Sequence, residues 1–172
     1  MKKLAFVING RGGVGKDMLC AAAAEKYAVC NVSSITPIKE IAARCGWKGE
    51  KDDRARRFLA GLKELTIAYN DFPTVWGLAR YREFLAGEDD IFFIHIREPK
   101  EIEKFVRRAE AKVYTLLIRA DRRLPPHTYG NASDDGVENY AYDCCFDNDG
   151  TPEESAEKFL ELLASLREKE SL

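Results

Sequence analysis

Short, continuous apolar runs alternate along the chain with longer segments in which apolar and polar residues are mixed. The runs Leu4–Ile8 and Ile91–Ile96 are apolar almost throughout, which is typical of strands buried on both faces of a sheet. The segment 152–169 instead repeats apolar residues at helical spacing, which is typical of an amphipathic helix. Together these patterns predict strands over 4–8, 28–32, 91–96, 112–119 and 143–146, and helices over 17–27, 37–45, 54–69, 74–85, 99–109 and 152–169.

Strands that alternate with helices predict a parallel sheet covered on both faces. The expected fold class is therefore α/β with three layers, in which a parallel five-stranded sheet is flanked by helices. The length of 172 residues fits one domain. We expect residues 1–172 to form this single domain, with a helical insert at about 36–86 and a short lid at about 120–138.

Composition excludes several classes of partner. Lys and Arg number 27 and Asp and Glu number 29, which gives a net charge of −2 and argues against nucleic acid as a partner. No apolar run reaches the roughly 18 residues that suggest a membrane span, so no membrane partner is expected. The five cysteines are odd in number and include no Cys-x-x-Cys pair, which favours reduced thiols and a cytoplasmic location. A homodimer stays open.

A glycine-rich stretch follows the first predicted strand and precedes the first predicted helix. It matches the pattern Gly-x-x-x-x-Gly-Lys, with Asp where Ser or Thr is usual. Glycines allow the backbone to turn several N–H groups toward one phosphate, and the helix adds the positive end of its dipole. The lysine would reach the β- and γ-phosphates. The residues expected to bind ATP here are Gly10, Arg11, Gly12, Gly13, Val14, Gly15, Lys16, Asp17 and Met18.

Asp17 stands where a hydroxyl usually binds Mg²⁺. A carboxylate is also a hard oxygen ligand, so Asp17 is the candidate metal ligand. Negative charge in the first turn of a helix is favourable without any metal, and this alternative stays open. The strand over 91–96 carries His95 near its end rather than a second carboxylate. His95 is either a packed strand residue or a member of the site.

Arginines follow the predicted strands at the edge where a parallel sheet binds its ligands. Arg97 follows the strand over 91–96, Arg119 ends the next strand, and Arg122 and Arg123 come directly after it. Phosphoryl transfer needs cations around the transferred group, and the planar, permanently charged guanidinium suits this role. Lys16 and these four arginines are the catalytic candidates. For each arginine, a solvated surface charge is the alternative.

With these residues in place, the chain resembles the P-loop nucleoside and deoxynucleoside monophosphate kinases, within the adenylate-kinase-like group. The Gly-Lys-Asp end of the loop is typical of phage-type deoxynucleotide monophosphate kinases and of animal phosphomevalonate kinases. Segments 33–40, 96–101 and 146–151 are similar to the family's Ser-Phe-Ala-x-Pro-Leu-Lys, Val-Arg-x-Pro-x-Glu and Asn-Asp-Gly-Thr motifs. The resemblance extends from residue 4 to about residue 166.

The resemblance implies a P-loop NTPase fold and transfer of the γ-phosphoryl group of Mg-ATP to a small-molecule acceptor, a (deoxy)nucleoside monophosphate. It implies that Asn148, Gly150 and Thr151 lie near the adenine of ATP and that Arg97 contacts the acceptor. The helical insert would carry the acceptor pocket. The substrate-binding candidates are Ser33, Ser34, Lys39, Arg57, Arg80 and Arg97, with Lys51 and Tyr69 as further polar residues.

Two other functions stay open. The segment from Arg11 to Lys16 also resembles the Lys-Gly-Gly-x-Gly-Lys loop of ParA/MinD-like ATPase switches, in which the first basic residue reaches across a dimer. The other alternative is a nucleotide-binding protein with little turnover. Its basis is that Met18 and His95 stand where the kinase family often has Thr and Asp.

Overall fold

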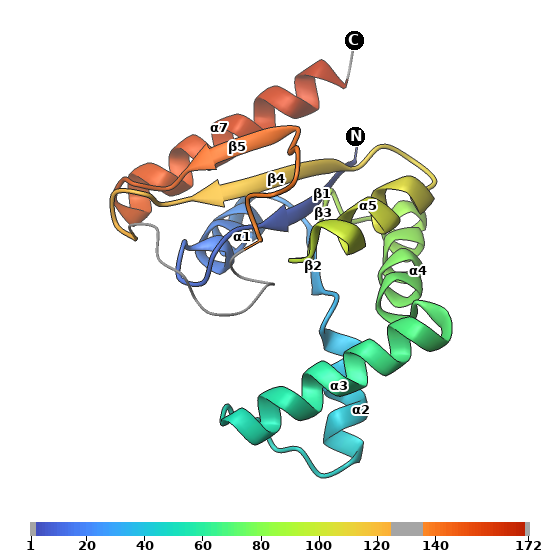
Figure 1. Cartoon of the computed structure of the whole chain (residues 1–172). Coiled ribbons are helices and arrows are strands. Elements are labelled where there is room, and N and C mark those ends of the chain that lie inside the picture. The colour runs from blue at the N-terminus through green and yellow to red at the C-terminus, as the bar shows by residue number, and fades with distance from the viewer. Residues whose placement is uncertain (1–2, 125–135, 171–172) are drawn as a thin grey trace.

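Five parallel strands form one sheet in the computed structural model, which describes residues 3–124 and 136–170 (Figure 1). The strand order is β2-β3-β1-β4-β5, and each neighbouring pair is parallel. The carboxyl ends of the strands therefore meet at one edge, on either side of β1. The strands are β1 (Leu4–Asn9), β2 (Val29–Ser33), β3 (Ile91–His95), β4 (Tyr114–Arg119) and β5 (Cys144–Asp147).

Helices connect β1 to β2, β2 to β3 and β3 to β4, because parallel strands cannot be joined by a tight turn, and one more helix follows β5. The helices are α1 (Lys16–Lys26), α2 (Thr36–Arg44), α3 (Asp53–Asn70), α4 (Phe72–Ala86), α5 (Pro99–Arg108) and α7 (Pro152–Lys169). The predicted bounds agree with these, and the largest differences are two residues, at the starts of α4 and β4. The predicted α/β class with a five-stranded parallel sheet is confirmed. Residues 125–135 of the expected lid lie outside the described residues.

Alternate residues of β1 supply the cores of the two helical layers. Leu4, Phe6 and Ile8 pack in one cluster with residues of α1 and α7, such as Leu19 and Phe159. The β1 residues between them pack with α4 and α5 instead, in a cluster that includes Ala5, Val7, Leu78, Tyr81 and Phe105. All of these side chains are buried, and complete burial of a Leu or Phe side chain contributes about 1.5–3 kcal/mol. The two cores fix β1, and with it the loop that follows.

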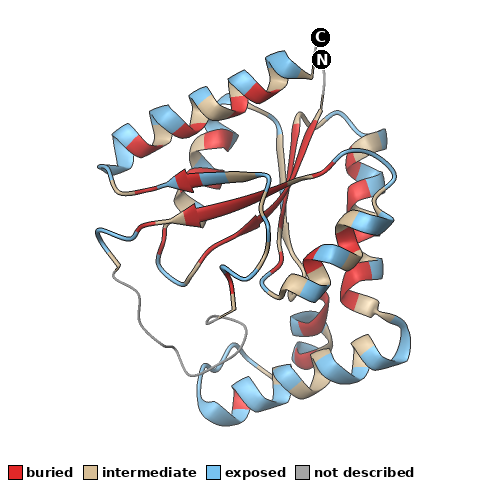
Figure 2. Cartoon of the chain, turned by 45° about the horizontal axis from the view of Figure 1, so that its top comes forward, coloured by how far each residue is buried: buried red, intermediate tan, exposed pale blue. Residues whose placement is uncertain are grey.

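Two helices between β2 and β3 extend away from the sheet. They are α2 and α3, which lie together below the sheet in Figure 1. Ala55 is the one residue of α3 that is buried, and Figure 2 shows exposed residues along most of this helix. None of the helices in the described part of the chain is both long and apolar enough to cross a membrane.

The far end of α3 is fixed to the rest of the molecule at Asp71. This residue joins α3 to α4 and has a φ of 55°, in the left-handed region. Its carboxylate accepts a hydrogen bond from Lys104 Nζ at 2.7 Å and lies 3.7 Å from Arg108 Nη1. Both cations belong to α5, so α5 holds the turn that sets the direction of α3.

Gly77 allows α4 to approach the sheet closely, and this makes a prediction. A Cβ at Gly77 would lie 2.7 Å from Ile94 Cδ1, whereas a Cβ at Gly61 on α3 has no atom within 4 Å. We expect Gly77→Ala to lower the free energy of unfolding by about 1–3 kcal/mol through overpacking. We expect Gly61→Ala to raise it by about 0.5–1 kcal/mol, because alanine favours the helix. Urea unfolding followed by circular dichroism measures both, and equal effects at the two positions would show that the contact with Ile94 is unimportant.

Candidate functional site

The loop between β1 and α1 has a backbone that requires glycine at three positions. Gly10, Gly13 and Gly15 have φ values of 150°, 82° and 91°. A Cβ at Gly10 would lie 2.5 Å from Ile118 O, and one at Gly15 would lie 2.4 Å from Asn148 Nδ2. The loop thus passes close to β4 and to the chain after β5 and then enters α1 directly. This arrangement of strand, glycine loop and helix N-terminus is suited to binding phosphate.

Lys16, the first residue of α1, turns its side chain back over the loop. Its Nζ donates hydrogen bonds to Gly10 O at 2.5 Å and to Arg11 O at 2.9 Å. Gly12 and Gly13 lie beside it and are exposed. The ammonium group is therefore already at the mouth of the loop, where it can meet the charge of a polyphosphate. This geometry fits the predicted phosphate site.

A buried amide, that of Asn148, fixes the α1 end of the loop. Asn148 is 1% exposed, and its Nδ2 donates a hydrogen bond to Val14 O at 2.7 Å. Its backbone N–H donates to Arg119 O at 2.6 Å, and its carbonyl accepts from Arg123 Nε and Nη2 at 3.0 and 2.7 Å. Asn148 and Arg123 therefore hold the loop to the carboxyl ends of β4 and β5.

Asn9 fixes the β1 end of the loop. It is 1% exposed, and its Oδ1 accepts a hydrogen bond from the N–H of Gly10 at 2.8 Å. Its Nδ2 donates to Arg97 O at 2.9 Å and to Tyr142 Oη at 2.8 Å. Burial raises the pKa of Tyr142 to about 12, so its hydroxyl stays protonated and donates to Val137 O at 2.6 Å. Asn9 thus ties the loop to the segments that follow β3 and precede β5.

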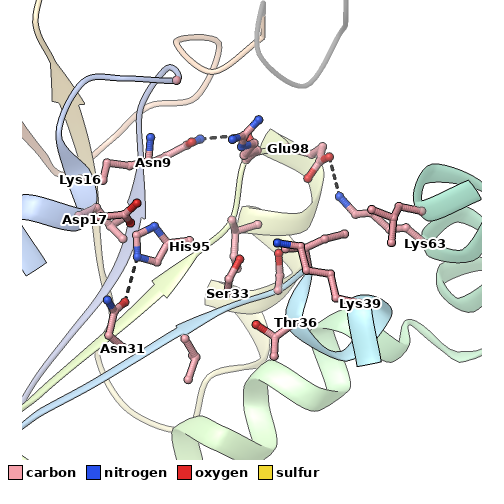
Figure 3. Close-up of a pocket in the computed structure, with 18 of the residues that line it drawn as sticks. Asn9, Lys16, Asp17, Asn31, Ser33, Thr36, Lys39, Lys63, His95 and Glu98 are labelled. Atoms are coloured by element: carbon pink, nitrogen blue, oxygen red, sulfur yellow. Dashed lines mark hydrogen bonds and ion pairs between the residues drawn. The ribbon is translucent and has the colours of Figure 1, made fainter. Parts of the chain in front are cut away.

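A cavity of about 770 Å³ opens beside the loop, at the carboxyl ends of β1, β2 and β3 (Figure 3). Its far wall is formed by the first turn of α2 and by one face of α3. This volume is in the range of small-molecule sites. The lining residues with polar side chains are Asn9, Lys16, Asp17, Asn31, Ser33, Ser34, Thr36, Lys39, Lys63, His95, Arg97 and Glu98.

Asp17 is the residue at the cavity that best suits a divalent cation. Its carboxylate lies in the first turn of α1, next to Lys16, and lines the cavity. Among the described residues it forms no hydrogen bond or salt bridge, so its oxygens are available to a metal ion. The residues present therefore fit a magnesium ion, which the carboxylate of Asp17 would hold. The described part of the chain contains no cluster of three or more His, Cys, Asp or Glu residues suited to a metal.

His95 lies between Asp17 and Asn31 at the end of β3 (Figure 3). Its Nε2 is 2.9 Å from Asn31 Oδ1 and 4.0 Å from Cys20 Sγ. Burial lowers the pKa of His95 below its ordinary 6.5, and Lys16 and Arg97 lower it further, while Asp17 opposes them. The ring is therefore neutral near pH 7, and Nε2–H donates to the Asn31 oxygen. The structure places His95 in the cavity, which was one of its two predicted positions.

The end of the cavity away from the loop is rich in cations and hydroxyl groups. Ser33 ends β2, Ser34 follows it, and Lys39 comes from α2, while Arg97 follows β3 nearer the loop. Lys63 of α3 forms a salt bridge with Glu98, with Nζ and Oε1 2.6 Å apart. This salt bridge joins α3 to the chain after β3 at the side of the cavity (Figure 3).

The structure brings together only part of the predicted site. Residues from the predicted sets that line the cavity are Gly12, Gly13, Lys16, Asp17, Ser33, Ser34, Lys39 and Arg97. Val14 is buried, and the side chain of Met18 packs against the core. Arg11 forms a salt bridge with Glu138, with Nη2 and Oε1 2.9 Å apart.

Four of the predicted acceptor residues lie elsewhere. Arg57 is exposed on α3 and does not line the cavity. Arg80 pairs with Glu83 on α4 and acts electrostatically on Cys30, in the first half of β2, so it lies toward the amino edge of the sheet. Tyr69 is 88% exposed at the end of α3. Lys51 is exposed and does not line the cavity either.

Several residues predicted to contact ATP or the transferred group have other partners in the described structure. Arg119 pairs with Asp147 at 3.0 Å, and Arg123 binds the carbonyl of Asn148. Thr151 accepts the N–H of Glu154 and caps α7, with Gly150 packed beside Glu154. Arg122 is exposed, and its backbone N–H donates to Asp149 Oδ1 at 3.0 Å. None of these four side chains lines the cavity.

The sequence-based prediction missed other residues of the site. Asn9 ends a buried apolar strand, and a polar residue at that position was a readable signal. Asn31 lies in β2 and Thr36 begins α2, and both could have been included with Ser33. Lys63 and Tyr142 carried no local signal, because their place depends on how α3 and the segment before β5 pack.

The chain matches no family model and no curated protein. A solved structure of a sugar kinase from Janibacter sp. is similar to it, with a TM-score of 0.51, 16% identity, and coverage of 94% of this chain and 95% of the other. A gluconokinase from Sinorhizobium meliloti has a TM-score of 0.49 at 15% identity, with coverage of 96% and 94%. A shikimate kinase from Aquifex aeolicus has a TM-score of 0.48 at 13% identity, with coverage of 95% and 98%.

The sheet order, the glycine loop and the likeness to the sugar kinase define the class: this chain has the P-loop kinase fold. The predicted P-loop fold is thereby confirmed. At these identities the likeness concerns the fold alone. The nature of the acceptor has to be argued from the cavity itself.

The buried imidazole of His95 predicts a pH dependence of stability. Because the pKa of His95 is lowered in the folded protein, the unfolded chain takes up a proton there below about pH 6.5 while the folded chain does not. The free energy of unfolding therefore falls as the pH falls, by at most about 1.4 kcal/mol per pH unit from this residue. We expect His95→Gln, which keeps a donor for Asn31, to lose less stability than the wild type between pH 7 and pH 5. Urea unfolding across this range measures the difference, and parallel curves for the two proteins would contradict the prediction.

The buried amide of Asn148 predicts a linked loss of stability and nucleotide affinity. In Asn148→Ala the carbonyl of Val14 loses its donor at 2.7 Å and keeps only Arg123 Nη2 at 3.5 Å, which we expect to cost about 1–3 kcal/mol. The loop also loses its fixed conformation, so we expect weaker binding of Mg-ATP by calorimetry. Asn139→Ala, at an exposed asparagine, is the control. Unchanged ATP affinity in Asn148→Ala would show that the loop keeps its shape without this contact.

Proposed function

We propose that this protein is an ATP-dependent phosphotransferase that transfers the γ-phosphoryl group of Mg-ATP to a nucleoside or deoxynucleoside monophosphate. The observation that carries the proposal is the charge of the cavity. The glycine loop and Lys16 lie at one end, Lys39 and Lys63 come from the helices that form the far wall, and Arg97 follows β3 beside the start of the loop. A cavity with cations at both ends suits two phosphorylated ligands that meet between them.

The carboxylates at the cavity also favour a phosphate over a hydroxyl as the acceptor group. Within the described residues, its lining includes two carboxylates, Asp17 and Glu98, and Glu98 is paired with Lys63. A hydroxyl acceptor needs a base to take its proton, whereas a phosphate monoester already has an ionised oxygen for attack. Positioning and electrostatic stabilisation then account for most of the catalysis.

Each residue has a defined role in this proposal. Lys16 and the loop N–H groups hold the β- and γ-phosphates, and Arg97 neutralises charge between donor and acceptor. The oxygens of Asp17 hold the divalent cation, directly or through water. A magnesium ion held there would supply positive charge that offsets the negative charge of the phosphates. Lys39 and Lys63, with Ser33 and Ser34, hold the acceptor phosphate.

A second candidate function rests on His95. Its imidazole is neutral near pH 7 and lies in the cavity, so it suits the role of a general base for a hydroxyl acceptor. The three structurally similar kinases are described as kinases of shikimate, sugar and gluconate. An acceptor of this kind is therefore the alternative to test beside the monophosphates.

The ATPase switch is less well supported. In that function Arg11 would reach a nucleotide in a second copy, but here its guanidinium lies 2.9 Å from the carboxylate of Glu138 in the same chain. Dimerisation that requires ATP and is lost in Arg11→Ala would favour the switch. Size-exclusion chromatography with and without Mg-ATP distinguishes the ATPase switch from the phosphotransferase.

The experiment that tests the proposal is coupled ADP release with Mg-ATP. The acceptors are the eight common nucleoside and deoxynucleoside monophosphates, together with shikimate, gluconate and a sample without acceptor. We expect stimulation by one or a few monophosphates and its loss in Lys16→Ala. Stimulation by an unphosphorylated acceptor alone would replace the proposal with the second candidate. ATP binding without any stimulation would leave the nucleotide-binding protein as the function.

The acceptor end of the cavity makes a sharper prediction. Removing the ammonium in Lys39→Ala removes one charge-assisted contact, so we expect the KM for the acceptor to rise about tenfold or more. The KM for ATP should stay the same, because Lys39 lies away from the loop. Lys51→Ala is the matched control, since Lys51 is exposed and does not line the cavity. Equal effects of the two substitutions in steady-state kinetics would remove Lys39 from the acceptor site.

A further inference from the structure

Four apolar residues form a stripe along one side of α3. They are Phe58, Leu62, Leu65 and Tyr69, and their spacings of four, three and four place them on one helix face. Leu62 is half-buried, while Phe58, Leu65 and Tyr69 are 38%, 70% and 88% exposed. We call these four residues the outer stripe. Large exposed apolar side chains gathered on one face of a surface helix indicate an interaction surface.

The outer stripe is separate from the cavity of the proposed active site. The α3 residues that line that cavity are Leu59, Ala60 and Lys63. A helix has 3.6 residues per turn, so the mean position of these three residues is rotated by roughly 140° about the axis of α3 from that of the outer stripe. The two sets therefore occupy nearly opposite faces of the helix. A partner on the outer stripe therefore leaves the cavity accessible.

The charges beside the outer stripe suit a second copy of the same helix. Arg57 and Glu64 each precede a stripe residue and are seven positions apart, so they lie on the same flank. Both are exposed, and neither forms a salt bridge within the described part of the chain. In a parallel pair this flank of one copy lies on the opposite side of the interface from the same flank of the other, so Arg57 and Glu64 of the two copies do not meet. In an antiparallel pair with Phe58 opposite Leu65, Arg57 of one copy is offset by only about 3 Å along the axis from Glu64 of the other, and this occurs twice.

A second cavity lies at the start of the outer stripe. It has a volume of about 480 Å³, and its wall includes Trp47, Arg54 and Phe58. Arg54 and Phe58 are four residues apart and therefore lie on the face of the outer stripe. In the same antiparallel register, Tyr69 of one copy lies opposite Arg54 of the other. The most exposed aromatic residue of α3 thus meets a cavity lined by tryptophan and arginine, which is a frequent arrangement of interface anchors.

We propose that the protein forms a symmetric homodimer through antiparallel pairing of the outer stripes of two copies of α3. Phe58 packs against Leu65 of the second copy, Arg57 pairs with Glu64, and Tyr69 enters the cavity beside Trp47. The inference does not depend on the proposed function, since no group of the active-site cavity takes part. The pairing is independent of ATP.

Sedimentation velocity of the full chain over a concentration series, without nucleotide, tests the proposal. We expect a monomer–dimer equilibrium in the wild type and a dimer Kd raised more than about tenfold in Leu65→Glu and in Tyr69→Ser. Both side chains are exposed, so circular dichroism and thermal unfolding should show an unchanged fold. The matched control is Val75→Glu, an equally drastic change at a 40% exposed apolar residue of α4 outside the outer stripe, which should dimerise like the wild type.

A charge exchange tests the register. Arg57→Glu and Glu64→Arg should each weaken the dimer, and the double variant should restore it. A monomer at every soluble concentration would overturn the proposal, as would a dimer that survives Leu65→Glu and Tyr69→Ser. A dimer lost in those variants but not rescued by the charge exchange would overturn the antiparallel register. If Leu65→Glu forms a dimer with the same Kd as the wild type, the interface lies elsewhere on the molecule.

Discussion

Two buried asparagine amides hold the glycine-rich loop, and the position of the groups that the loop presents to the cavity depends on them. Asn9 accepts the first N–H of the loop, and Asn148 donates to the carbonyl of Val14 near its end. Each is 1% exposed, so losing either partner would leave a polar group buried and unsatisfied. The loop thus keeps one shape although three of its glycines have positive φ values. Rigid hydrogen-bond donors are what stabilisation of a transferred phosphoryl group requires.

Much of the fold could be predicted from the sequence because its signals are local and strong. Continuous apolar runs mark β1 and β3, which are buried on both faces, and proline marks the first turns of α2, α4, α5 and α7. The glycine loop was equally readable, since its conformation follows from the glycines themselves. Arg97 was placed at the cavity because it follows a strand, and Lys39 because its segment resembles a family motif. Both come soon after the carboxyl end of a strand, and these ends meet at one edge.

The rest of the site depends on tertiary packing, to which sequence spacing gives no access. The rotation of α3 about its axis decides that Lys63, and not Arg57, faces the cavity. The pairing of β4 with β5 places Asp147 beside Arg119, so a predicted catalytic cation becomes half of a surface salt bridge. Thr151 was read from a nucleotide-binding motif, but the start of α7 needs its hydroxyl as a cap. In each case the residue type suggested a role in binding, but the residues packed against it in the fold determined what it does.

The salt bridge between Lys63 and Glu98 has a consequence for which molecules enter the cavity. It is partly shielded, with the two side chains 17% and 31% exposed, and it joins α3 to the chain after β3 at the side of the cavity. An uncharged ligand does not compete with Glu98 for the ammonium group of Lys63, so the salt bridge stays intact. An anion competes with Glu98 for the ammonium group, and the released carboxylate can turn to water. An anion at Lys63 therefore competes with a contact that also joins α3 to the chain after β3, so the charge of a ligand and the position of α3 are coupled at this salt bridge.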